Sequence, residues 1–169
     1  MRTKTRFTRS ILAATLAMAF AAASSTAVAG TATDNINVSA SVVASCTIAV
    51  STQLAFGDYD PIVANKSTPL DAQAAIDTTC STGATPTITL GLGDNAVGSV
   101  RNMANGANTL SYEIYTENTH TNVWDDTTGL DLATGTGTLV TTPVYGRVAA
   151  DQNVAVGDYT DIVVATVTF

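Results

Sequence analysis

The chain has 169 residues, of which 46% are hydrophobic, and 14 acidic residues against 7 Lys and Arg give it a formal net charge of −7 at pH 7. Phosphate binding requires clustered Lys and Arg, so this balance excludes nucleic acid as a partner. A single histidine and the absence of a Cys-x-x-Cys motif also argue against a metal centre, and we expect no cofactor.

Residues 1–29 have the three parts of a secretory signal peptide. Four basic residues precede an apolar stretch at 11–23, and "AVA" at 27–29 fits the small-residue cleavage pattern. A membrane-spanning helix is the alternative, but it needs roughly 20 apolar residues and this stretch is shorter. Cleavage leaves a chain of one-domain size with a net charge of about −11, so we expect export and attribute solubility to the acidic excess.

An apolar and polar alternation begins soon after the predicted cleavage site. Ile36, Val38, Ala40 and Val42 alternate with Asn and Ser, which is the period-2 pattern of a β-strand. The pattern fits the first strand of a sandwich. It fits equally a strand that detaches and pairs with another molecule, and alternation alone does not decide between the two.

The two cysteines, Cys46 and Cys80, lie in a chain whose expected export permits their oxidation. We predict a disulfide between them. In the chain-entropy model, a bond that closes a loop of this length contributes roughly 3 to 4 kcal/mol. Two free thiols are the alternative.

Strand patterns recur along the rest of the chain, separated by turns rich in Gly, Asn, Asp and Pro, and helical patterning is nearly absent. The predicted strands are 35–50, 73–80, 86–92, 109–116, 138–148 and 159–169. The last of them presents Val163, Ala165, Val167 and Phe169 as one apolar face that continues to the final residue. Because chain ends usually fray, this face requires a partner. The spacing predicts an all-β sandwich or barrel in one domain.

Several residues invite a chemical interpretation. The acidic pairs at 58/60 and 125/126 could serve as glycosidase carboxylates or as calcium ligands, but their spacing fits no known calcium loop and solvated turns explain them better. His120 lies in a polar stretch without a nucleophile elbow, so we do not expect catalysis there. Trp124 and Tyr115 could form a sugar-binding surface, although packing in the core or at its rim is the favoured interpretation. We expect no enzyme.

Six segments together resemble the spore coat protein U domain, which the Csu-type pilins of archaic chaperone-usher pili share. The segments are "VVASCTI" (42–48), "LAFGDYDP" (54–61), "IDTTCSTG" (76–83), "RNMANGANTLSYEIYTE" (101–117), "VYGRV" (144–148) and "GDYTDIVVATVTF" (157–169). The resemblance extends over essentially the whole exported chain.

The resemblance implies an incomplete immunoglobulin-like sandwich that lacks its last strand. In such families a periplasmic chaperone lends a strand to the open groove, and at an outer-membrane usher the N-terminal extension of the next subunit replaces it. Carried onto this sequence, residues 30–42 form the donor extension, with Ile36, Val38, Ala40 and Val42 as the side chains that fill the groove. Residues 43–169 form the domain, and the face formed by Val163, Ala165, Val167 and Phe169 lines part of the groove.

The expected function is therefore that of a structural pilus subunit, which polymerises with identical or related subunits into surface fibres for adhesion and biofilm formation. One alternative is a coat or matrix protein that assembles without an usher. Another is a secreted monomer that binds carbohydrate or calcium and places its own N-terminal strand in the groove.

Overall fold

The computed structural model describes residues 28–169, so the predicted signal peptide lies almost wholly outside the described residues. The chain divides between Ala40 and Ser41 into two units. No helix occurs in the described range, and hence none that is long and apolar enough to cross a membrane.

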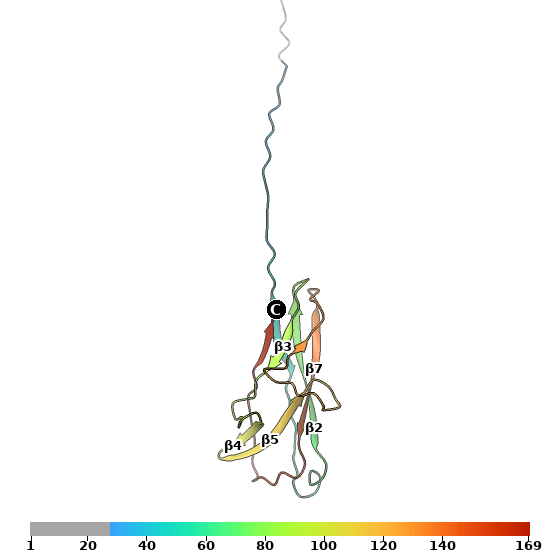
Figure 1. Cartoon of the computed structure of the whole chain (residues 1–169), viewed down its shortest axis with the longest axis vertical. Helices are drawn as coiled ribbons and strands as arrows, with labels where there is room; N and C mark the ends of the chain where they lie inside the picture. Colours follow the sequence, from blue (N-terminus) through green and yellow to red (C-terminus); the bar gives the residue numbers. More distant parts are fainter. Residues whose placement is uncertain (1–27) are drawn as a thin grey trace, which may run out of the picture. The chain divides into compact units, whose positions relative to one another are not determined.

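The unit Ser41–Phe169 contains two antiparallel sheets (Figure 1). The first sheet has the order β1 (Cys46–Thr52), β2 (Leu70–Cys80), β7 (Leu139–Val148), β5 (Asn108–Tyr115) and β4 (Arg101–Asn105). The second has the order β6 (Leu130–Asp131), β3 (Thr87–Leu90) and β8 (Ala165–Thr168). The predicted all-β fold class is confirmed.

Strands β2, β5 and β7 alternate buried and less buried residues, which places one face of the large sheet on the core. The core combines these residues with Ile88 and Leu90 of β3 and with Trp124. Trp124 is fully buried, and its Nε1 donates a hydrogen bond to the carbonyl oxygen of Ile88 at 2.8 Å. The prediction that this tryptophan packs in the core is confirmed.

Arg101 at the start of β4 is a buried charge that the sequence pattern did not indicate. Its guanidinium pairs with Glu113 and donates to the carbonyl oxygens of Leu90, Gly91 and Trp124. These acceptors replace the hydrogen bonds with water that the guanidinium loses when it is buried. It therefore ties the edge of the large sheet to the end of β3.

Two of the predicted strand limits are wrong. The strand predicted at 35–50 begins only at Cys46, and the strand predicted at 159–169 is regular only in β8. Strands β4 and β6 were not predicted. β4 was hidden because the stretch 102–109 is rich in turn residues, yet only Gly106 and Ala107 form the loop between β4 and β5. Gly106 has φ 61°, as a two-residue hairpin loop requires.

The predicted disulfide is present. Cys46, the first residue of β1, is bonded to Cys80, the last residue of β2, which lies directly opposite it in the antiparallel pair. Two hydrogen bonds continue the pairing beyond the bond: the N–H of Ser45 donates to Oγ of Ser81, and the N–H of Ser81 donates to the carbonyl oxygen of Ser45. The start of β1 is thus fixed to the end of its neighbour β2.

Replacing both cysteines, Cys46→Ser with Cys80→Ser, is expected to lower the free energy of unfolding by about 3 kcal/mol, because the unfolded chain regains the entropy that the cross-link removes. Urea denaturation of the purified chain measures the change. The reduced wild-type chain is the matched control and should unfold at the same urea concentration as the variant. Equal stability of the oxidised and reduced chains would contradict the prediction.

Candidate strand-binding groove

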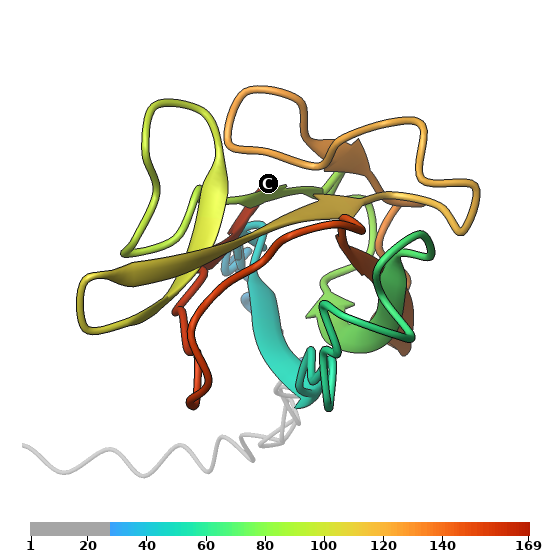
Figure 2. The same cartoon turned by 90° about the horizontal axis from the view of Figure 1, so that it is seen from below.

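The two sheets leave one side of the core open between β1 and β8. β1 is the outer strand of the large sheet, and β8 is the outer strand of the small one, so each has a single strand neighbour. They come close to each other, and Figure 2 shows β1 and the C-terminal segment on the same side of the domain. Unpaired N–H and C=O groups along two facing edges are a template for an added strand.

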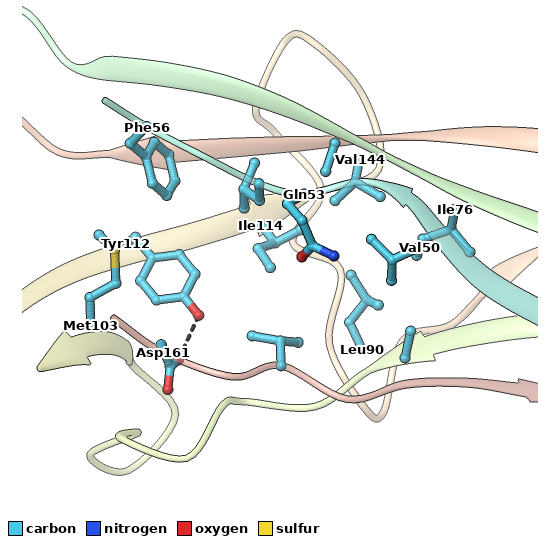
Figure 3. Close-up of a pocket in the computed structure, with 14 residues that line it drawn as sticks. Val50, Gln53, Phe56, Ile76, Leu90, Met103, Tyr112, Ile114, Val144 and Asp161 are labelled. Carbon is cyan, nitrogen blue, oxygen red and sulfur yellow. Dashed lines mark hydrogen bonds between the residues drawn. The ribbon is translucent and has the colours of Figure 1, made fainter. Parts of the chain in front are cut away.

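Between these edges lies an apolar cavity of about 150 Å³ (Figure 3). We call it the groove. Its walls come from both sheets and include Val50 of β1, Ile76 of β2, Ile114 of β5, Val144 of β7 and Leu90 of β3. All of these except the exposed Val50 are core positions, so the groove opens onto the interior of the sandwich.

The C-terminal residues predicted for the groove lie in different places. Val163 and Ala165 line the groove. Val167 packs against the core cluster, while the Phe169 side chain is 51% exposed. Residues 161–164 precede β8, and they too alternate between partly buried and exposed positions. The carbonyl oxygen of Val164 accepts a hydrogen bond from the N–H of Gly91 at 2.9 Å.

A polar cluster interrupts the apolar wall near Asp161. The Tyr112 hydroxyl donates to Oδ2 of Asp161 at 2.6 Å (Figure 3), and Oδ1 of Asp161 accepts from the backbone N–H and the side-chain amide of Asn95. Burial, followed by the hydrogen bond to Asp161, raises the pKa of Tyr112 well above its usual value. The tyrosine therefore stays neutral and is held in the wall.

Gln53 was not predicted as a groove residue, but it lines the groove. Strict alternation from Val50 would point Thr52 inward. The pairing of β1 with β2 shifts between these two residues, so that Val50 lies opposite Ile76 and Thr52 lies opposite Ala75. One extra residue in a strand reverses the side chains that follow it. The bulge is not visible in a hydrophobic pattern, which explains why the residue was missed.

A second hollow of about 480 Å³ adjoins the groove and shares Leu54, Phe56 and Met103 with it. The segments 54–61 and 154–159 form its two sides. Open space therefore continues beyond the groove, past the end of β1, and its lining there is partly polar.

The predicted donor residues belong to a segment without regular structure. Residues 28–45 contain no strand, and the side chains of Ile36, Val38 and Val42 are 89%, 90% and 93% exposed. Ala40 is exposed as well. Exposed apolar side chains at alternate positions are unfavourable in water.

Two of the four acidic residues considered for catalysis or calcium binding, Asp60 and Asp125, stabilise turns. Asp60 accepts hydrogen bonds from the N–H groups of Ile62 and Val63, which lower its pKa. Asp125 accepts from those of Thr127 and Thr128, with the same effect on its pKa. Within residues 28–169, no three His, Cys, Asp or Glu side chains are grouped as metal ligands.

His120 packs edge-on against the rings of Tyr115 and Tyr145, with centroid distances of 5.1 and 6.5 Å. Its Nε2 is buried 3.8 Å from Asp71, whose carboxylate is already paired with Arg147. The residue has φ 55°, which the turn at 117–122 imposes. These contacts place His120 in a packed turn that joins β5 to the rest of the domain.

That turn is expected to depend on pH through Glu117. Its carboxylate accepts hydrogen bonds from the hydroxyl of Thr116 and from the N–H groups of Asn122 and Thr121, which lower its pKa from 4.5 to about 2. Since the folded pKa lies below the unfolded one, the turn is stabilised above pH 4.5 and loses this contribution as the pH falls towards 2. Amide NMR shifts of Thr121 and Asn122 should titrate with a midpoint near that lower value. Glu117→Gln should remove the transition, and a midpoint at the ordinary glutamate pKa would contradict the prediction.

Comparisons with known proteins support the fold. Over 76% of this chain, the structure matches a chain of the CsuC–CsuE chaperone–tip adhesion subunit pre-assembly complex from the archaic chaperone-usher Csu pili of Acinetobacter baumannii, with a TM-score of 0.55 and 19% identity. It covers 40% of that chain. The P pilus rod subunit PapA matches over 73% of this chain and 97% of its own, with a TM-score of 0.50 and 16% identity. At such identities the likeness concerns the fold alone, and it confirms the immunoglobulin-like pilin fold.

The sequence has a nearer relative. It is 39% identical over 175 residues to Protein U of Myxococcus xanthus, and the match includes 95% of this chain and 98% of that protein. The model of the spore coat protein U domain matches residues 32–166. The resemblance seen in the six sequence segments is confirmed, and the chain belongs to the spore coat protein U domain family.

Proposed function

We propose that this chain is a non-enzymatic structural subunit of surface fibres, exported and assembled by a chaperone-usher pathway. In the fibre, residues 31–42 of one copy occupy the groove of the next copy as an added β-strand. The observation that carries the proposal is the apolar groove between the unpaired edges of β1 and β8. A periplasmic chaperone fills the groove before assembly, and an outer-membrane usher is the site of exchange.

The predicted donor segment has the chemistry of such an occupant. Its apolar residues alternate, so that one face enters the groove while the backbone pairs with β1 and β8. The four side chains bury roughly 250 to 400 Å² of apolar area, which corresponds to about 6 to 10 kcal/mol before ordering costs. Asp34 is the single charge between residues 31 and 42, so the segment brings little electrostatic repulsion into the groove.

A donor from a neighbouring copy is favoured over the chain's own segment. To reach its own groove, the segment would have to reverse between Val42 and Ser45, within the residues "VVAS". Tight hairpin loops require residues such as Gly, Asn or Asp, and this stretch has none. Ser45 also pairs with Ser81 and so extends the line of β1 by one residue, which leaves the chain running straight where it would have to reverse. A self-complemented monomer that binds carbohydrate or calcium is therefore disfavoured.

Co-expression with a periplasmic chaperone and an outer-membrane usher, followed by electron microscopy of the cell surface, tests the proposal. Surface fibres that contain this chain are the expected result, and their loss on removal of the chaperone supports the pathway. Attachment and biofilm growth should then follow fibre number. A stable monomer that forms without any chaperone and binds a sugar or calcium would contradict the proposal.

The relationship to Protein U and the name of the family favour a second candidate, a coat or matrix protein of the cell surface. The same joint between segment and groove would link its copies, but without an usher. Genes for a chaperone and usher next to this gene, and loss of assembly when the usher is deleted, favour the fibre. Assembly that persists without an usher favours the coat.

A further inference from the structure

The groove contains one polar side chain that has no hydrogen-bond partner among the described residues. It is the amide of Gln53, which the bulge in β1 turns onto the same wall as Val50. Figure 3 shows it among Val50, Ile114 and Val144. The side chain is exposed while the groove is open, so water satisfies its amide in this state.

An added strand displaces this water. The amide of Gln53 then loses its hydrogen bonds unless the incoming strand offers new ones, and an unsatisfied buried amide is costly. Tyr112 and Asp161, by contrast, already hydrogen-bond each other. The penalty at Gln53 therefore depends on which residue of the strand lies against it.

The proposed donor segment offers two kinds of inward-facing residue. Ile36, Val38 and Val42 are branched and bulky, whereas Ala40 has a single methyl group. A branched side chain against Gln53 would press methyl groups onto the amide. Against Ala40, there is room for the amide to turn to the main-chain N–H and C=O groups of the docked strand.

We infer that Gln53 determines the register of the docked strand by selecting Ala40 as its partner, an inference that rests on the proposed function. A shift by two residues preserves the inward face but places Val38 or Val42 against the amide. A shift by one residue turns the polar face inward. The groove is thus specific for a strand with one small residue among bulky apolar ones at alternate positions.

A double-mutant cycle in the full chain, co-expressed with its chaperone and usher, tests this inference. Ala40→Val should slow the formation of multimers by about tenfold or more, because it buries the amide unpaired. Adding Gln53→Leu should restore most of the lost rate, since no polar group is then buried. Multimers are measured as the ladder that survives unheated electrophoresis in detergent.

Thr52→Leu is the matched control, because Thr52 lies opposite Ala75 and does not line the groove. It should not rescue Ala40→Val. If Ala40→Val slows multimer formation equally in the wild-type chain and in the Gln53→Leu variant, the inference is overturned and the proposed function stays intact. A wild-type chain that forms no multimers would overturn both.

Discussion

Deletion of residues 31–42 is expected to abolish fibres while residues 43–169 still fold and bind the chaperone. The deletion removes all four apolar side chains proposed to fill the groove of the next copy, but none of the core residues or the disulfide. Electron microscopy of cells and affinity purification of the chaperone complex measure the two outcomes. The loss of fibres should be complete, because no other exposed segment among the described residues is proposed to replace the strand.

A second variant keeps the length of the segment. Ile36→Asn with Val38→Asn removes apolar contact while the backbone groups that pair with β1 and β8 remain, so it should also prevent assembly. Normal fibres from the deletion would refute the assignment of the donor strand. If the asparagine variant forms fibres and the deletion does not, backbone pairing is sufficient for assembly.

Val163→Asp is expected to block the groove. A carboxylate at this position must lose its water when a strand docks, and no described basic side chain lines the groove to compensate it. Docking of either the chaperone strand or the neighbour's strand should weaken by at least about a hundredfold. The yield of chaperone complex from the periplasm and the number of fibres should both fall.

Val164→Asp is the matched control, because this neighbouring side chain is 63% exposed and does not line the groove. It adds the same charge one position along the chain, on the other face. Assembly should therefore persist. If both variants assemble equally well, the groove between β1 and β8 is not the docking site.

The apolar alternation of residues 36–42 and 163–169 predicted a strand near each end of the chain. It did not show where regular structure begins, because a strand forms only where it has a neighbour. Cys46 has Cys80 opposite it, whereas residues 28–45 have no strand partner in the described structure, and so the strand predicted from residue 35 starts at residue 46. Phe169, predicted to line the groove, is half exposed because β8 ends before it.

Two other features depend on tertiary contacts that no local pattern encodes. Arg101 looks like a surface residue in the sequence, yet carbonyl groups from distant segments and Glu113 hold it inside the domain. Gln53 looks like part of a loop, and the bulge in β1 turns it into the groove. Both were missed because they lie outside the strands predicted from the sequence.

A cryo-electron microscopy reconstruction of the assembled fibre tests the central proposal most directly. We predict a continuous strand of density between β1 and β8 of every subunit, which belongs to residues 31–42 of its neighbour and has Ala40 next to Gln53. A groove filled by the same chain's own residues 31–42, or subunits that meet through other surfaces with the groove empty, would contradict it.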